Sequence, residues 1–277
     1  MQAVFVTGAS TGIGYAAAVR LARSGFAVFA GCRKESDAQR IAGADRSIRP
    51  LLVDVQDAEQ IADAARAVAA SGIPLRGIVN NAGIAVAGPL EHLPIDELRR
   101  QFEVNVFGAI AVTQAFLPQL RTARGRVVFL SSVSGQLAPP YLGPYAASKF
   151  ALEAIADSLR MELAPFGIAV SVVQPGNVKT PIWAKGRAAK DELLARLPGR
   201  ALHHYGAAID ALARITEREE RTGIEADAVA EVILKALTDA KPKARYPVGA
   251  PAGWMRRCAA LLPEAFRDRL IMKNFRN

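Results

Sequence analysis

The chain has 277 residues, of which 51% are hydrophobic and 22% charged, and its net charge is +9. This composition excludes a disordered or fibrous protein and allows one large α/β domain or two smaller ones. The positive charge raises nucleic acid as a partner, but the basic residues are scattered and form no nucleic-acid-binding motif. We therefore expect no nucleic-acid partner and a basic, soluble surface.

The two ends of the chain and its cysteine content indicate in which part of the cell the protein is expected. A strand-like run begins at residue 3 without a charged and apolar leader before it, and no apolar run is long enough to span a bilayer. Two cysteines are too few for a disulfide framework, so we expect a reducing, cytoplasmic environment. The segment 254–275 mixes apolar residues with arginines, and it could lie on an anionic membrane surface. Packing on its own domain or on a partner subunit is the favoured interpretation.

Short β-branched runs alternate with segments of helical period along most of the chain. The runs lie at residues 4–8, 27–31, 48–55, 76–83, 125–132, 167–176 and 244–249. Strand followed by helix, repeated, predicts an α/β fold: one doubly wound, Rossmann-type domain over 1–277, with a seven-stranded, mostly parallel sheet and helices on both faces. Residues 181–224 break the rhythm and predict a substrate lid or, alternatively, a surface elaboration; residues 251–277 predict a helical extension.

The stretch TGASTGIG, residues 7–14, follows the first predicted strand and opens a helix. Its glycines, Gly8, Gly12 and Gly14, let backbone amides approach a phosphate, and the helix N-terminus favours the phosphate charge. Such a turn is weak evidence alone, but its place after a first strand indicates a dinucleotide site.

The residues at the end of the second predicted strand indicate which dinucleotide is bound. Arg33 and Lys34 stand where an acidic residue would take the ribose hydroxyls of NAD(H). Two cations favour a 2′-phosphate, so NADP(H) is expected over NAD(H); two solvated loop charges are the alternative. Asp54, after the third strand, either accepts from the adenine amino group or caps the helix that begins near Asp57.

Several polar residues remain ambiguous when taken singly. The turn VNNAG, residues 79–83, suits a ligand-binding path or an ordinary turn. Asn105, in an apolar helical stretch, is either a satisfied core amide or a holder of the active-site lysine or of a water. The serines in FLSSVSG have no hydrolase motif around them, and the three histidines lack metal-ligand spacing, so no metal is expected. Tyr145 and Lys149, four residues apart, share one helix face and could form an acid/base pair or be two unrelated surface residues.

Taken in order, TGASTGIG, NNAG, Asn105, Ser132, Tyr145-x-x-x-Lys149 and Pro175-Gly176 form a set that resembles the short-chain dehydrogenase/reductase (SDR) family, over about residues 3–250. The resemblance implies that Tyr145 donates and accepts the substrate proton and that Ser132 steadies the substrate carbonyl. Lys149 would bind the nicotinamide ribose and, together with the positively charged oxidised nicotinamide, lower the tyrosine pKa. Asn105 would keep a proton-relay water against Lys149. Ser131 and Tyr141 are the rivals of Ser132 and Tyr145.

The same resemblance, with the cations of the second strand, implies a set of cofactor contacts. The glycine turn would bind the pyrophosphate, and Asp54 would contact the adenine. Asn81 would contact the adenosine ribose, and Thr180 the carboxamide of the nicotinamide. The expected contact residues are Gly8, Ser10, Thr11, Gly12, Ile13, Gly14, Arg33, Lys34, Asp54, Val55, Asn81, Ala82, Gly83, Tyr145, Lys149, Pro175, Gly176, Val178 and Thr180.

The sequences of residues 80–110 and 244–270 are similar to those of the branch around retinol and 17β-hydroxysteroid dehydrogenases. This similarity implies a small apolar alcohol, ketone or aldehyde as substrate, and Ile182, Trp183 and Tyr205 would line the substrate pocket. Family members commonly pair through the helices that hold Tyr145 and Asn105, which implies a homodimer or homotetramer. The alternatives are a 3-ketoacyl carrier-protein reductase and a regulatory protein that binds the dinucleotide without turnover.

Overall fold

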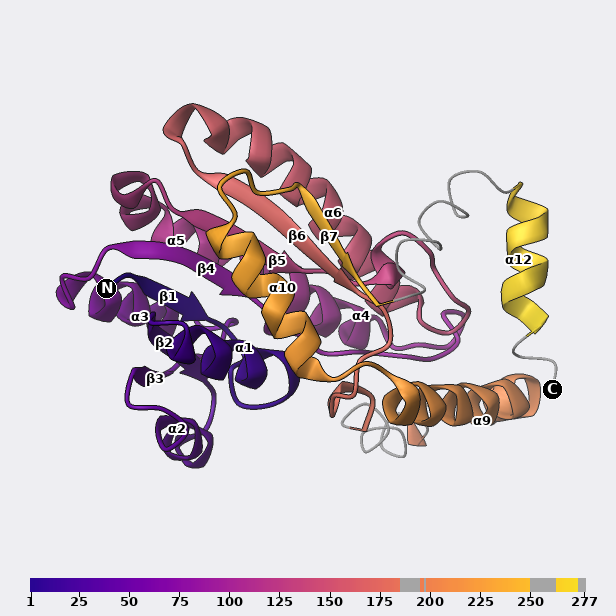
Figure 1. The fold of residues 1–277 in the computed structure, drawn as a ribbon. Coiled ribbons are helices and arrows are strands. Elements are labelled where there is room, and N and C mark those ends of the chain that lie inside the picture. The colour runs from indigo at the N-terminus through magenta and orange to yellow at the C-terminus, as the bar shows by residue number, and fades with distance from the viewer. Residues whose placement is uncertain (185–194, 197, 250–262, 274–277) are drawn as a thin grey trace.

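The computed structural model describes residues 1–184, 195–196, 198–249 and 263–273. Its centre is a seven-stranded parallel sheet in the order β3-β2-β1-β4-β5-β6-β7 (Figure 1). The strands are β1 Ala3–Val6, β2 Ala27–Cys32, β3 Ile48–Leu52, β4 Leu75–Asn80, β5 Arg126–Leu130, β6 Ala169–Pro175 and β7 Arg245–Val248. Every pairing between these strands is parallel, which confirms the predicted fold class.

Helices connect successive strands, as parallel pairing requires. They are α1 Gly12–Arg23, α2 Glu35–Ala42, α3 Ala58–Ala70, α4 Ile95–Phe102, α5 Gly108–Ala123, α6 Gly143–Leu163, α9 Gly199–Thr222 and α10 Ala226–Thr238. A further helix, α12 Glu264–Lys273, follows β7. A π-helical turn, Glu103–Phe107, joins α4 to α5, and 3₁₀ turns lie at Val133–Gly135 and Ala164–Phe166.

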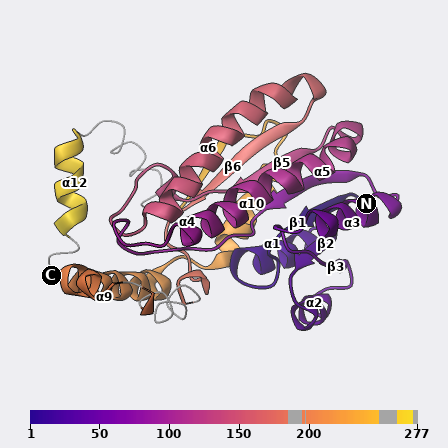
Figure 2. The same cartoon turned by 180° about the vertical axis from the view of Figure 1, so that it is seen from behind.

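Two hydrophobic cores lie on opposite faces of the sheet (Figures 1 and 2). One packs α1, α2 and α10 against the strands, and the other packs α3, α5 and α6. Strands β1, β2 and β5 are buried at every residue because both of their faces are covered. In the second core the rings of Phe5 and Phe116 stack with centroids 4.5 Å apart.

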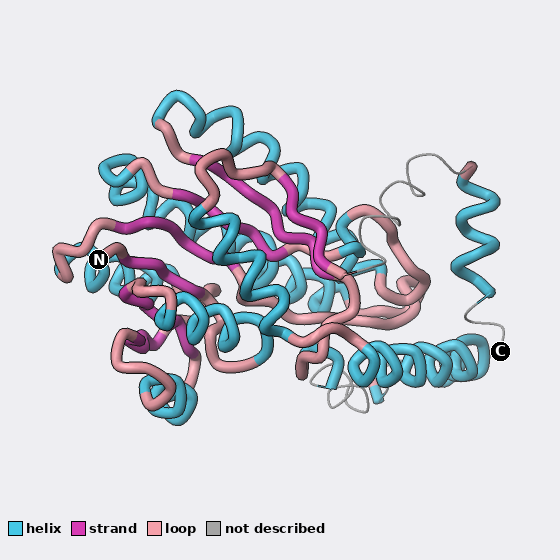
Figure 3. The backbone as a smooth tube through the Cα atoms, in the orientation of Figure 1, coloured by secondary structure: helices cyan, strands magenta, loops and turns pink. Residues whose placement is uncertain are grey.

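The strand order places a ligand-binding crevice at one edge of the sheet. β1 has β2 on one side and β4 on the other, so the chain reverses its direction of winding between β1 and β4. Ligands of open α/β sheets bind outside the carboxyl ends of the strands at such a reversal. In Figure 3 the loops after the strands gather at this end, and α9 lies beyond them.

The two elaborations are described in part. Residues 185–194 and 197 of the predicted lid lie outside the described residues, and its remainder is dominated by one long helix, α9. Of the C-terminal segment, 250–262 and 274–277 also lie outside them, including Trp254, and α12 carries Phe266 with 49% of its surface exposed. In the part of the chain that the structure describes, no helix is long and apolar enough to cross a bilayer.

Candidate active site

The glycine turn lies between β1 and α1, at the carboxyl end of β1. Gly8 and Gly12 have φ values of +63° and +57°, a conformation that favours glycine. Gly14 allows close packing, because an added Cβ would lie 2.3 Å from the Gly8 carbonyl oxygen. The first turn of α1 carries no acidic residue, so its backbone amides and dipole can receive an anion.

Asn81 braces this turn from the neighbouring strand. Its Nδ2 donates to the carbonyl oxygens of Thr7, at 2.9 Å, and Gly8, at 3.1 Å. Thr7 Oγ1 accepts from the backbone amides of Asn81 and Ala82, both at 3.0 Å. The sequence assigned Asn81 to the adenosine ribose; in the structure its side-chain amide fixes the glycine turn, and Thr7 is a partner that sequence reasoning missed.

At the end of β2, Arg33 lines the cavity, whereas Lys34 is exposed as the N-cap residue of α2 and lies outside the lining. A second cation was missed: Arg40, on α2, donates to the Ser10 carbonyl oxygen at 2.8 Å and pairs with Asp37. The sequence does not predict that Arg40 lies beside the glycine turn, because the position of this side chain depends on how α2 packs there.

The two interpretations of Asp54 separate in the structure. Asp57 caps α3, accepting from the backbone amides of Glu59 and Gln60, so the capping role for Asp54 is wrong. Asp54 lines the cavity, and its Oδ1 accepts from the Gln56 backbone amide at 3.0 Å. Its carboxylate therefore stands at the cavity wall with acceptor capacity toward a ligand.

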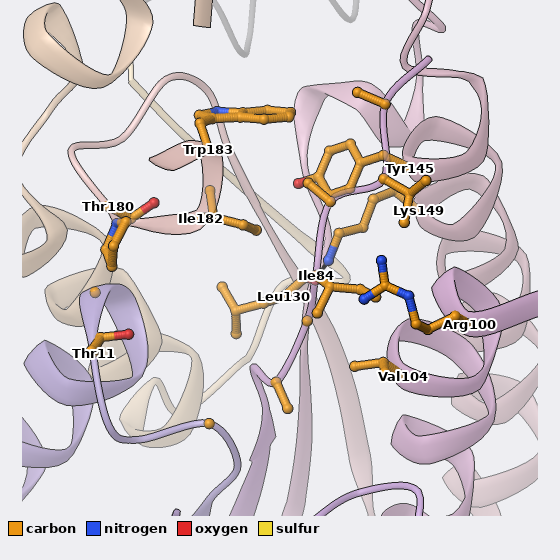
Figure 4. A pocket seen from close by; sticks show the side chains of 18 of the residues that line it. Thr11, Ile84, Arg100, Val104, Leu130, Tyr145, Lys149, Thr180, Ile182 and Trp183 are labelled. Carbon is orange, nitrogen blue, oxygen red and sulfur yellow. Dashed lines mark hydrogen bonds between the residues drawn. The ribbon is translucent and has the colours of Figure 1, made fainter. Parts of the chain in front are cut away.

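Tyr145 and Lys149 lie on the first turns of α6 and point into the same cavity (Figure 4). Lys149 Nζ donates to the Leu130 carbonyl oxygen at 2.7 Å and lies 5.6 Å from the centroid of the Tyr145 ring. Both residues are buried. The shared helix face predicted from their spacing is present, and the two side chains are close enough to interact electrostatically.

Burial shifts the two pKa values in opposite directions. It raises the pKa of Tyr145 to about 12, although the hydrogen bond with Ser132 opposes the rise. It lowers the pKa of Lys149 to about 8. Withdrawal of the phenol from water is the largest cause of the rise in the Tyr145 pKa, and the charge of Glu219 adds to it. The expectation that Lys149 and the oxidised nicotinamide together lower this pKa concerns the cofactor-bound site and stays a prediction.

The two candidate serines differ in their contacts. Ser132 hydrogen-bonds to Tyr145, and its Oγ accepts from the Ser134 backbone amide at 3.1 Å. Ser131 lines the cavity, and its Oγ is buried without a hydrogen-bond partner. The interaction with Tyr145 favours Ser132 for the reacting group, whereas Ser131 Oγ is buried against Gly135, 2.6 Å from where a Cβ of that residue would lie.

Asn105 lies in the π-helical turn between α4 and α5, where the sequence indicated a continuous helix. Its Oδ1 accepts from the Ile84 backbone amide at 2.9 Å, and its Nδ2 donates to the Ile84 carbonyl and to Ser148 Oγ, both at 3.1 Å. Ser148 Oγ in turn donates to the Tyr145 carbonyl at 2.7 Å. Asn105 thus anchors the loop after β4 to α6, through a serine that sequence reasoning missed.

A cavity of about 690 Å³ joins the glycine turn to Tyr145 and Lys149, whereas Ser132 and Asn105 lie outside its lining. At one end lie the glycine turn, Arg33 and Asp54; at the other, Tyr145 and Lys149 meet a mostly apolar wall. The wall consists of Ile182, Trp183, Ile209, Leu212 and Ala213, and the charged residues Glu97, Arg100 and Arg196 also line the cavity. Trp183 meets the Tyr145 ring edge-on, with centroids 5.5 Å apart.

Most of the predicted contact residues line this cavity: Gly8, Ser10, Thr11, Gly12, Ile13, Arg33, Asp54, Val55, Asn81, Ala82, Gly83, Tyr145, Lys149 and Thr180. The lining lacks Gly14, Lys34, Pro175, Gly176, Val178 and, among the predicted pocket walls, Tyr205. Pro175 and Gly176 pair with Val248 at the end of β6, and Val178 bridges to Ile224, so this segment guides the chain toward Thr180. Tyr205 instead donates to Glu91 at 2.6 Å.

These features fit a dinucleotide. The turn has the backbone conformation and close packing that a pyrophosphate cradle needs, and Thr180 stands over it, 3.2 Å from where a Cβ of Gly12 would lie. Among the described residues no group of three or more His, Cys, Asp or Glu side chains could hold a metal ion.

Comparison with known proteins places the chain in a family. The model of the short chain dehydrogenase family matches residues 2–191. An NADPH-dependent 3-dehydrocapnine reductase of Ornithobacterium rhinotracheale is 34% identical over 100% of this chain and 98% of its own length. Retinol dehydrogenase 5 of Mus musculus is 37% identical over 97% and 87%. A short chain dehydrogenase of Burkholderia cenocepacia, solved with NADP, has a TM-score of 0.75 and 25% identity over 98% and 99% of the two chains.

The ordered motifs, the parallel sheet, the cavity at its carboxyl edge and these similarities agree with one another. The chain belongs to the short-chain dehydrogenase/reductase family and is an NAD(P)-dependent oxidoreductase that acts on CH–OH groups.

Proposed function

We propose that the protein is an NADP(H)-dependent oxidoreductase of small apolar alcohols, ketones or aldehydes, with Tyr145 as its general acid and base. The observation that carries this proposal is the position of Tyr145, which lines a cavity with a mostly apolar wall, interacts with Ser132 and has Lys149 Nζ 5.6 Å from its ring centroid. A nicotinamide ring bound in this cavity would supply or accept the hydride.

Each polar group has a role that follows from its contacts. Tyr145 is positioned to donate its proton to the oxygen of a carbonyl substrate, or to take a proton from an alcohol. Ser132 donates to the same substrate oxygen and steadies negative charge as it develops there. Lys149, held against the Leu130 carbonyl, offers its remaining protons to the nicotinamide ribose and brings positive charge near the phenol.

The preference for NADP(H) rests on the cationic end of the cavity. Arg33 lines it, and Arg40 lies beside the glycine turn through its bond to Ser10. A guanidinium pairs well with a 2′-phosphate, and no carboxylate at the end of β2 would repel it. A relative at 34% identity is described as NADPH-dependent, which supports the same preference.

An apolar substrate class follows from the wall opposite Tyr145. Ile182, Trp183, Ile209 and Leu212 supply aliphatic and aromatic surface to that part of the cavity. All four belong to residues 181–224, which we propose to act as a substrate lid over one domain spanning 1–277. Arg196 ties this segment to α4 by ion pairs with Asp96 and Glu97, at 2.6 and 2.9 Å.

We further propose a homodimer or homotetramer assembled through α5 and α6. Large apolar side chains stand exposed on α6, where Phe150 is 43% and Met161 63% exposed. Two more lie in the turns that adjoin these helices: Phe107, just before α5, is 53% exposed and Phe166, just after α6, 48%. Such residues suit a buried interface between copies of the chain. Sedimentation of the wild-type protein beside a Phe150→Glu, Met161→Glu variant tests this, and identical monomeric profiles would contradict it.

The catalytic proposal is tested by initial rates with NADPH and NADH on apolar aldehydes, ketosteroids and 3-ketoacyl esters. Tyr145→Phe keeps the ring and removes the proton, so turnover should fall by about 10²- to 10⁴-fold. Tyr141→Phe is the matched control, because Tyr141 lies four residues earlier and outside the cavity lining. Turnover by Tyr145→Phe close to that control would refute the role of Tyr145.

A further inference from the structure

One face of α9 supplies part of the cavity wall. Ile209, Leu212 and Thr216 line the cavity at spacings of three and four residues, so their side chains share one face of the helix. Tyr205 precedes Ile209 by four residues and therefore stands on the same face, one turn nearer the start of the helix. Tyr205 lies outside the cavity lining, so its contacts concern the placement of the helix and not the substrate directly.

The end of α9 is fixed by backbone pairing. Just after the helix, Ile224 forms a parallel bridge with Val178, and its amide donates to the Asn177 carbonyl oxygen at 2.9 Å. The Lys179 amide donates back to the Ile224 carbonyl oxygen, also at 2.9 Å. At a helical rise of about 1.5 Å per residue, Tyr205 lies about 28 Å from this bridge. The start of the helix therefore needs an attachment of its own.

Tyr205 supplies an attachment at that end. Its hydroxyl donates to Glu91 Oε2 at 2.6 Å, and this bond holds the pKa of the Glu91 carboxyl below its usual range, so the bond is charge-assisted at neutral pH. The Tyr205 ring meets the rings of His92 and Tyr141 edge-on, with centroids 5.9 and 6.2 Å away. Because the His92 side chain is only 5% exposed, Tyr205 packs on a largely buried surface.

The segment that receives Tyr205 also belongs to the cavity. Gly88 and Pro89 line it, and Glu91 and His92 follow them directly. The Pro89 carbonyl oxygen accepts from the backbone amides of His92 and Leu93, both at 3.0 Å, so these residues form one compact turn. Tyr205 therefore joins the helix that carries one wall of the cavity to the turn that forms another.

We propose that Tyr205 is a positioning residue for the substrate pocket. Its contacts with the turn before α4 hold the first half of α9, and this places Ile209 and Leu212 in the cavity. The inference rests on the proposed function, in which this wall meets an apolar substrate. Arg196, which pairs with α4 just before α9 begins, provides a second attachment. Loss of the Tyr205 bond should therefore loosen the first half of the helix without releasing it.

Tyr205→Phe is the direct test, because it removes the hydroxyl and keeps the ring against His92 and Tyr141. Tyr246→Phe is the matched control. The Tyr246 hydroxyl also donates to a carboxylate, that of Asp239 at 3.0 Å, but it lies on β7 and outside the cavity lining. Both variants lose one bond between a tyrosine and a carboxylate, and only the first loses a bond that holds α9.

The first readout is steady-state kinetics with an apolar substrate. Tyr205→Phe should raise KM by about three- to tenfold, the range for the loss of one hydrogen bond. Its kcat should change by less than about twofold, because the wall meets the body of the substrate and not the reacting oxygen. The Kd of NADPH should stay at the wild-type value in both variants, since the glycine turn lies at the other end of the cavity. An equal KM in Tyr205→Phe and Tyr246→Phe would overturn the inference.

Two further readouts need no turnover, so they are independent of the catalytic proposal. Amide hydrogen exchange over residues 205–213 should accelerate in Tyr205→Phe by about three- to tenfold, while residues 216–222, beside the backbone bridge, should exchange as in the wild type. The Kd of N-phenyl-1-naphthylamine, an uncharged apolar dye, should rise as KM does, and Trp183→Ala should raise it too if the dye occupies this cavity. Wild-type exchange over 205–213, or a wild-type dye Kd, would overturn the inference. The proposed function fails separately, through turnover by Tyr145→Phe close to that of Tyr141→Phe.

The partner carboxylate supplies a second set of variants. Glu91→Ala removes the same bond from the other side and should raise KM and dye Kd by a similar factor. Glu91→Gln keeps an oxygen that can accept from the Tyr205 hydroxyl, so it should restore most of the loss. Tyr205→Phe combined with Glu91→Ala should be no worse than the more severe single variant, because both remove one interaction. Fully additive effects would show that the two residues act independently and would overturn the inference.

Discussion

Gly14→Ala should weaken both the fold and cofactor binding, because no space exists for a methyl group at this position. An ideal Cβ would lie 2.3 Å from the Gly8 carbonyl oxygen and 2.4 Å from Asn81 Nδ2, so these atoms must move by about 1 Å to reach ordinary contact. Overpacking of this kind costs about 1–3 kcal/mol. The helix preference of alanine returns only about 0.5–1 kcal/mol, which leaves a net loss of up to about 2.5 kcal/mol.

The displaced atoms are those of the glycine turn itself, so dinucleotide affinity should fall with stability. A loss of 1.4 kcal/mol in binding corresponds to about a tenfold rise in Kd. Urea unfolding without cofactor measures the first effect, and fluorescence titration with NADPH the second. Gly43→Ala, at the end of α2, is the matched control, because its nearest contact would be 3.6 Å away at a φ of −71°. Equal unfolding midpoints and Kd values for the two variants would refute the steric argument.

Three further substitutions test other parts of the molecule. Arg33→Asp should lower the NADPH/NADH ratio of kcat/KM by at least about tenfold, by replacing attraction to a 2′-phosphate with repulsion; an unchanged ratio would reject the assignment. Trp183→Ala should raise KM for apolar substrates by about tenfold while leaving the Kd of NADPH unchanged, and an equal loss for both would place Trp183 at the cofactor instead. Phe116→Ala should cost about 3–5 kcal/mol in urea unfolding, since the ring is fully buried against Phe5; the half-exposed Leu52→Ala should cost far less.

The sheet was predictable because its strands are buried on both faces. Continuous apolar runs such as Ala27–Cys32 admit few other structures when helical periods separate them. The glycine turn and the Tyr145 and Lys149 pair were also readable, because each depends on spacing within one element and on ordered motifs. The topological reversal beside β1 then brings these motifs to one edge.

What the sequence did not predict depends on contacts between distant elements. The π-helical turn at Asn105 breaks no local rule, and it forms where the amide must reach Ile84 and Ser148 at once. Whether Asp54 or Asp57, three residues later, caps α3 depends on where the helix begins, which pattern alone resolves poorly. Arg40 beside the glycine turn depends on the packing of α2, which the sequence does not specify.

The opposite pKa shifts of Tyr145 and Lys149 suggest which proton transfer the free site favours. With a tyrosine pKa of about 12 and a lysine pKa of about 8, the phenol keeps its proton throughout the neutral range while the lysine begins to lose its charge just above it. A protonated phenol is an acid, so the site as it stands is set to donate a proton to a carbonyl oxygen. Working as a base on an alcohol requires additional positive charge near the ring to lower the tyrosine pKa. Reduction should therefore persist toward acidic pH, whereas oxidation should depend steeply on pH and on the charge of Lys149.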